Sequence, residues 1–107
     1  MTRAIVFAIM VGAAAGGQPT RTFSGVVTDS ECSNGDHSHM RMGPTDAECV
    51  KACISEHGAS YVLYDGKNTY TLSDQKTPQH FAARKVIVTG TLDPRTKTIR
   101  VESIKAK

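Results

Sequence analysis

The amino-acid sequence predicts a mainly β domain (β+α): a five-stranded OB-like barrel with a helical insertion between strands one and two and a short helix between strands three and four. Three observations predict it. Five short segments are rich in β-branched residues, turn residues join four of them into two hairpins, and one well-capped helix stands between the first two. An open sandwich of the same strands is the alternative arrangement.

The expected strands share β-branched and aromatic residues and are bounded by turn residues. They cover Thr22–Ser30, Ser60–Tyr64, Thr69–Leu72, Lys85–Leu92 and Thr98–Ile104. The second and third strands flank Asp65-Gly66-Lys67-Asn68, and the last two flank Asp93-Pro94-Arg95-Thr96, which are both turn sequences. Gly25 and Gly90 interrupt two of the strands and would suit the tight coiling of a barrel.

The clearest helix signal covers about Asp46 to His57. Thr45 can cap its start, Glu48 three residues later completes the pattern of a capping box, and Gly58 supplies the stop. A second, shorter helix is expected from residue 77 to about residue 83, because a proline occupies its first turn.

The first residues are typical of a secretory signal peptide. Arg3 gives the positive start, residues 4–12 form an uncharged apolar run, and residues 13–15 are three alanines that signal peptidase accepts. The run is much shorter than the roughly 20 residues that a spanning helix needs, so no membrane span is expected. The prediction is a signal peptide over 1–15 and a single OB-like domain over 16–107, with the insertion at about 31–58, in a secreted or periplasmic protein.

The charge balance argues against a nucleic-acid partner. The chain has 13 basic and 10 acidic residues, a net charge of +3. Without Arg3, 12 basic residues remain against 10 acidic ones, or +2. This excess is small, the basic residues are scattered, and the expected strand faces lack interleaved aromatic residues.

Several motifs resemble a family of small secreted bacterial proteins, OB-fold-like, whose helical insertion carries Cys, His and Met. The matching segments are FSGVVTDSEC (23–32), a His- and Met-containing loop, CVKAC (49–53), YVL (61–63), YTLSD (70–74) and VIVTGTLD (86–93). This similarity covers nearly the whole mature chain. It implies the fold and the export, and it implies no activity.

The insertion holds nearly all the residues that could carry chemistry. Cys49, Cys53 and His57 are spaced by four, so an intact helix would project them along one face. The C-x3-C-x3-H spacing resembles the ligands of dinuclear copper centres, and C-x3-C resembles copper-delivery proteins of respiratory oxidase assembly. In those families the residues lie on loops of cupredoxin or thioredoxin folds, which this sequence does not predict.

The preceding loop adds donors of the same kind. His37 and His39 offer imidazoles and Met40 and Met42 offer thioethers, with alternate side chains pointing the same way if the segment is extended. Cys32 stands just before this loop. Three thiolates and one histidine would satisfy tetrahedral zinc, whereas thiolates with a thioether would favour Cu(I). The sequence therefore predicts an exported metal-binding module, with copper favoured over zinc and another exported protein as a further partner.

The alternative is a disulfide-stapled structural or protein-binding domain without metal or catalysis. Cys32 paired with Cys49 or Cys53 would tie the insertion to the barrel and leave one thiol over, because the cysteine count of 3 is odd. His57 is also well placed simply to favour a helix C-terminus, and methionines are commonly gap-filling side chains. No enzymatic activity is predicted, because no substrate pocket or further polar machinery is visible in the sequence.

Overall fold

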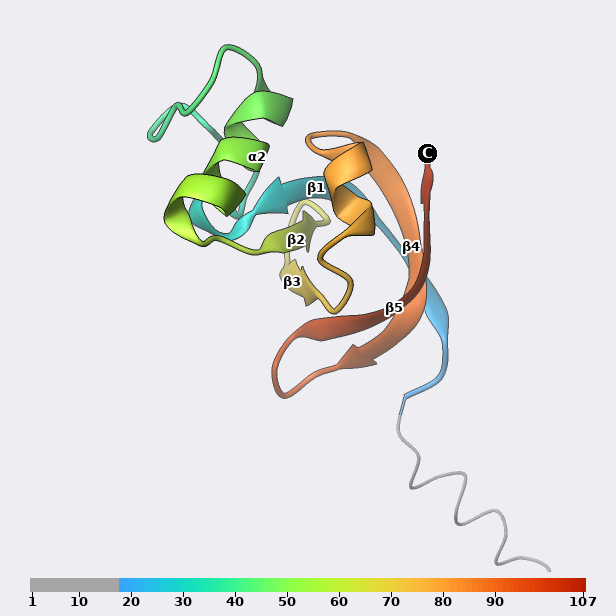
Figure 1. Cartoon of the computed structure of the whole chain (residues 1–107). Helices are drawn as coiled ribbons and strands as arrows, with labels where there is room; N and C mark the ends of the chain where they lie inside the picture. The colour runs from blue at the N-terminus through green and yellow to red at the C-terminus, as the bar shows by residue number, and fades with distance from the viewer. Residues whose placement is uncertain (1–17) are drawn as a thin grey trace, which may run out of the picture.

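The computed structural model of the protein describes residues 18–107, so the expected signal peptide lies outside the described residues. Within these residues the fold is mainly β, with five strands, one α-helix and two short 3-10 helices (Figure 1). The elements in chain order are β1 (Arg21–Asp29), η2 (Ser30–Cys32), α2 (Asp46–His57), β2 (Tyr61–Tyr64), β3 (Thr69–Leu72), η3 (Thr77–Phe81), β4 (Lys85–Asp93) and β5 (Thr98–Ala106). This is the predicted order, and the bounds of α2 are those expected from its caps.

The strand pairings form a closed ring in the order β1-β2-β3-β5-β4. Strand β1 serves two neighbours: Arg21–Val26 pairs with β4, and Val26–Asp29 pairs with β2. The β3–β5 pair is parallel, and the other four pairs are antiparallel. Because every strand has two neighbours, none of the five leaves a free sheet edge along its whole length.

Two glycines stand where strands approach closely. A Cβ built on Gly25 would collide with the backbone carbonyl of Tyr64, and one on Gly90 would collide with that of Arg100. Gly25 lies where β1 changes partner, and Gly90 lies at the register irregularity between β4 and β5. Both glycines therefore permit the strong coiling predicted for them.

A single core of aliphatic and aromatic side chains fills the ring. Its fully buried members include Val27, Leu63, Val86, Val88 and Ile99. On β4, Val86 and Val88 alternate with more exposed residues. The helix α2 joins this core through Val50, which is also fully buried. In Figure 1, α2 lies to one side of the ring of strands, near the arrowhead of β1.

The helix begins and ends as its sequence predicts. The side chain of Thr45 accepts a hydrogen bond from the backbone N–H of Glu48, and Gly58 adopts a left-handed conformation with φ of 66°. The second predicted helix is shorter than expected, because only the 3-10 helix η3 forms and the chain leaves it before Ala83. Within residues 18–107, no helix combines the length and the apolar character needed to cross a membrane.

Candidate metal centre

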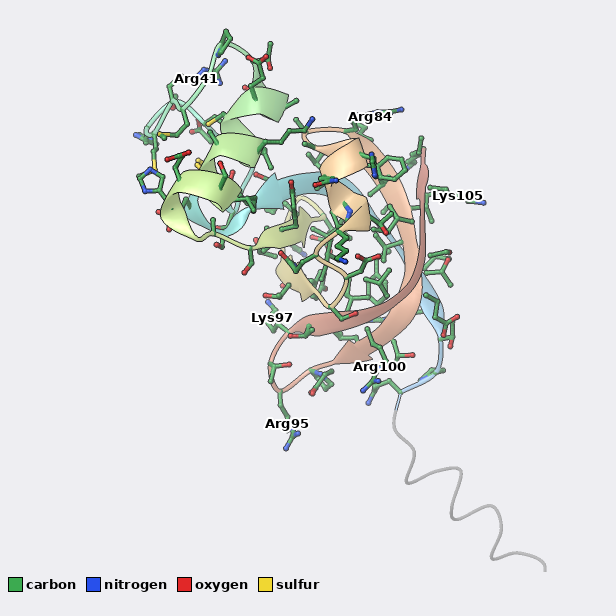
Figure 2. All side chains as sticks on the ribbon, in the orientation of Figure 1. Arg41, Arg84, Arg95, Lys97, Arg100 and Lys105 are labelled. Atoms are coloured by element: carbon green, nitrogen blue, oxygen red, sulfur yellow. The ribbon has the colours of Figure 1, made fainter. Side chains whose placement is uncertain are left out.

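Three buried side chains from different parts of the insertion converge beyond the end of β1. Sγ of Cys32, a ring nitrogen of His37 and Sγ of Cys49 all lie within 4.8 Å of one another. The residues are 5%, 4% and 0% exposed, respectively. The sulfur atoms of this region gather between α2 and the loop that precedes it (Figure 2). Two soft thiols and an imidazole are a donor set that could hold a metal ion.

Cys32 is held by a tight turn at the end of β1. One carboxylate oxygen of Asp29, Oδ1, accepts hydrogen bonds from the backbone N–H groups of Glu31 and Cys32, both at 2.9 Å. The carbonyl oxygen of Cys32 accepts two more, from Oγ1 of Thr28 at 2.8 Å and from the N–H of Gly35 at 2.8 Å. The backbone on both sides of Cys32 is thus fixed before any ligand arrives, which favours a preformed site.

Cys49 is presented by the first turns of α2 and is tied to the loop before it. Its Sγ accepts a hydrogen bond from the backbone N–H of Met42 at 3.3 Å and donates one to the carbonyl oxygen of Met40 at 3.2 Å. The two methionines therefore meet Cys49 through their backbone groups. Their side chains are half-buried.

His37 is buried, although Asp36 and Ser38 on either side of it are exposed. The segment turns here instead of running extended, so the condition under which His37 and His39 would point the same way is not met. The N–H and Oγ of Ser38 both donate to Oδ1 of Asp36, at 3.0 and 2.7 Å, which makes a compact turn. This turn directs His37 inward and leaves the side chain of His39 89% exposed.

Cys53 is fully buried one helical turn beyond Cys49, but it is not one of the three residues of the cluster. Burial, together with the nearby carboxylate of Asp29 and the other two thiols, raises the pKa of Cys53 to about 12. Burial and Asp29 also raise the pKa of Cys32. These thiols therefore stay protonated near neutral pH unless a cation is present to stabilise their thiolates.

Two further histidines lie outside the cluster: His57, which was a candidate ligand, and His80, which was not. His57 is exposed at the last position of α2, where it favours the helix C-terminus, and His80 is exposed on η3. The labelled basic residues lie far apart, from Arg41 in the loop before α2 to Arg95 at the β4–β5 turn (Figure 2).

None of the three cysteines forms a disulfide in this structure. All three are buried free thiols. The predicted staple therefore does not describe this state of the protein.

Sequence reasoning missed Asp29. The residue ends a strand and its side chain is fully buried, and its Oδ2 atom lies 4.0 Å from Nδ1 of His37. The only signal was local: an Asp three residues before Cys32 can cap a short turn. Its approach to His37 depends on how the loop returns, which no local pattern describes.

Comparison with known proteins finds no match: no family model fits the sequence, and no curated protein or solved structure is significantly similar to it.

Proposed function

We propose that the protein is an exported metal-binding module that holds one thiophilic ion at Cys32, His37 and Cys49, with copper, as Cu(I), favoured over zinc. The observation that carries the proposal is the convergence of three buried ligand atoms within 4.8 Å. They come from η2, the loop that follows it and α2, so the path of the insertion brings them together.

The electrostatics of the site support a cation. Asp29 is fully buried and, after burial itself, is the next cause that raises the pKa values of the thiols of Cys32 and Cys53. Among the described residues, the buried side-chain atoms without a hydrogen-bond partner are Oδ2 of Asp29 and Nδ1 of His37. Two unsatisfied polar atoms are costly in an apolar interior. A bound cation would offset that cost by attracting the carboxylate and the thiolates.

The donor set favours copper in one respect and zinc in another. Thiolates select Cu(I), which accepts low coordination numbers, and the cluster offers two thiolates and one imidazole. Zinc is the second candidate because Cys53 is also buried on the same helix. A small movement that added this thiol would complete the Cys₃His set of a closed structural zinc site.

The competing proposal is a structural domain stapled by a disulfide between Cys32 and Cys49. Because Sγ of Cys32 and Sγ of Cys49 lie within 4.8 Å, a modest approach would allow a disulfide between η2 and α2. Such a bond would remove two of the three ligands. Metal and disulfide are therefore alternative states of one site, as an exported protein would encounter them.

We also infer that the closed ring of strands is an OB-like barrel, as the strand order and the position of the insertion suggest. The motif resemblance to small secreted bacterial proteins supports export. The role of the barrel in this proposal is to carry the insertion, since the cluster lies beyond the end of β1.

The test is metal analysis of the mature chain, purified without chelators after growth with copper or with zinc, together with a thiol count. We expect about one equivalent of metal, and protection of the cluster thiols from alkylation. His37→Asn should lower the metal content, and the matched control His80→Asn should not, because His80 is exposed on η3. Competition between Cu(I) and Zn²⁺ for the wild-type protein identifies the preferred ion.

Metal-free protein under both growth conditions, with no uptake on titration, would overturn the proposal. A mass lower by two hydrogens with one reactive thiol would favour the disulfide-stapled alternative.

A further inference from the structure

Asp29 and His37 face each other with matching unsatisfied atoms. Oδ2 of Asp29 and Nδ1 of His37 are 4.0 Å apart, and their side chains are 0% and 3% exposed. Neither atom has a hydrogen-bond partner. The distance exceeds that of a charge-assisted hydrogen bond, which is about 2.8 Å, so an approach of about 1 Å would form one.

The two oxygens of Asp29 have separate surroundings. Oδ1 is occupied by the backbone N–H groups of Glu31 and Cys32, which fixes the orientation of the carboxylate. Oδ2 is left to face His37. Asp29 itself is not a member of the three-residue cluster. The carboxylate of Asp29 thus accepts hydrogen bonds from the turn that holds Cys32, and it also faces the ring of His37.

Histidine ligands in metal sites commonly donate their other ring N–H to a carboxylate, which fixes the tautomer and the orientation of the ring. We propose that Asp29 is a positioning residue for the metal site: it accepts a hydrogen bond from Nδ1–H of His37 and thereby directs Nε2 toward the ion. This inference rests on the proposed function, because it assigns a role within that same site.

The assignment accounts for both unsatisfied atoms at once. A proton on Nδ1 gives Oδ2 of Asp29 its missing donor, and it leaves the lone pair of Nε2 free for a metal. The opposite tautomer would place the unprotonated Nδ1 against a carboxylate, where two acceptors meet without a proton between them.

The first experiment is Asp29→Asn. The asparagine oxygen can keep the hydrogen bonds from the backbone N–H groups of Glu31 and Cys32, whereas the NH₂ group that replaces Oδ2 cannot accept a hydrogen bond from Nδ1–H of His37. We expect metal affinity, titrated separately with Cu(I) and with Zn²⁺, to fall by about 10- to 100-fold.

The matched control is Asp74→Asn. Oδ1 of Asp74 accepts from the backbone N–H groups of Lys76 and Thr77, at 2.9 and 3.0 Å, as Oδ1 of Asp29 does from Glu31 and Cys32. Both variants therefore replace a carboxylate that accepts hydrogen bonds from a backbone turn, but Asp74 does not face His37. Only Asp29→Asn should weaken metal binding.

The second experiment needs no variant. Nitrogen NMR of wild-type protein loaded with Cu(I) or Zn²⁺, both diamagnetic, identifies which ring nitrogen of His37 carries the proton. We expect the proton on Nδ1 and the metal on Nε2. This readout remains available if Asp29→Asn fails to fold, and a purely structural role of Asp29 would not determine it.

The outcomes separate this inference from the proposed function. If wild-type protein binds neither ion, the metal-site proposal itself fails. If it binds metal but His37 is coordinated through Nδ1, or if Asp29→Asn binds as tightly as wild type, the metal site stands and the role of Asp29 is overturned.

Discussion

The backbone N–H of Met42 donates a hydrogen bond to Sγ of Cys49 at 3.3 Å, so the loop before α2 is fastened to the helix through a candidate metal ligand. The same sulfur donates to the carbonyl oxygen of Met40. A thiolate would keep the first hydrogen bond as an acceptor and lose the second with its proton. Metal binding and the position of this loop are therefore coupled.

Cys49→Ser should separate stability from metal binding. A hydroxyl can accept from Met42 and donate to Met40 as the thiol does, so the free energy of unfolding of the metal-free protein should change by less than about 1 kcal/mol. Loss of a residue that only hydrogen-bonds a metal ligand lowers metal affinity by roughly 10- to 100-fold. Loss of the candidate ligand Cys49 itself should lower it further. Denaturant unfolding and metal titration of the same samples measure both quantities.

The control for that prediction is Cys49→Ala, which removes both hydrogen bonds and the sulfur. It should weaken both metal binding and stability. Equal stability of the alanine and serine variants would mean that the hydrogen bonds to Met40 and Met42 contribute nothing to holding the loop.

The metal-free protein should lose stability at alkaline pH. The pKa of Cys53 is raised from 9.0 to about 12 in the folded protein, which means that folding favours the neutral thiol. A group with a raised folded-state pKa contributes stability that is complete below its unfolded value and is lost as pH rises toward its folded value. The loss should therefore begin near pH 9 and continue toward pH 12.

Urea unfolding between pH 7 and pH 10.5 tests this prediction, with Cys53→Ala as the comparison. The alanine variant should be less stable at pH 7, but its stability should decline less steeply above pH 9. Parallel curves for the two proteins would show that Cys53 does not control the alkaline loss.

Local sequence signals were sufficient for most of the fold and only for part of the site. Thr45 and Gly58 define α2 because capping depends on residues close in the chain. Cys32, His37 and Cys49 were recognised as candidate ligands from their chemistry. The inward direction of the His37 side chain and its approach to Asp29 were not predicted. They depend on the path of the loop, which is set by hydrogen bonds such as that from the N–H of Ser38 to Asp36.

Gly90→Ala should destabilise the pairing of β4 with β5 strongly. An alanine Cβ would collide with the backbone carbonyl oxygen of Arg100, which a strand pair holds in place. Overpacking of this kind costs about 1–3 kcal/mol, more than the roughly 0.4–1 kcal/mol that Gly→Ala gains through the unfolded chain. Ser24→Ala on exposed β1 surface is the control and should have little effect. Thermal unfolding that gave Gly90→Ala a wild-type stability would contradict the close approach of β4 and β5.

Gln75→Glu should weaken the junction between β2 and β3. The side-chain amide of Gln75 accepts from the N–H of Tyr61 at 2.7 Å and donates to the carbonyl oxygens of Tyr61 and Leu72 at 3.0 and 2.8 Å. A glutamate keeps the acceptor but loses both donors, and at neutral pH it sets a negative charge against two carbonyl oxygens. Two lost hydrogen bonds predict a cost of about 1–3 kcal/mol.

The pH dependence distinguishes this cause from a general loss of stability. Repulsion by the two carbonyl oxygens should raise the folded-state pKa of the new glutamate, because only the protonated acid can donate to one of them. Its destabilising effect should therefore be large at pH 7 and should shrink as pH falls toward about 4, the ordinary value for glutamate. Gln79→Glu, at an exposed position of η3, should show neither the cost nor this recovery. A deficit of Gln75→Glu that stayed constant between pH 7 and pH 4 would mean that repulsion between the carboxylate and the two carbonyl oxygens is not its cause.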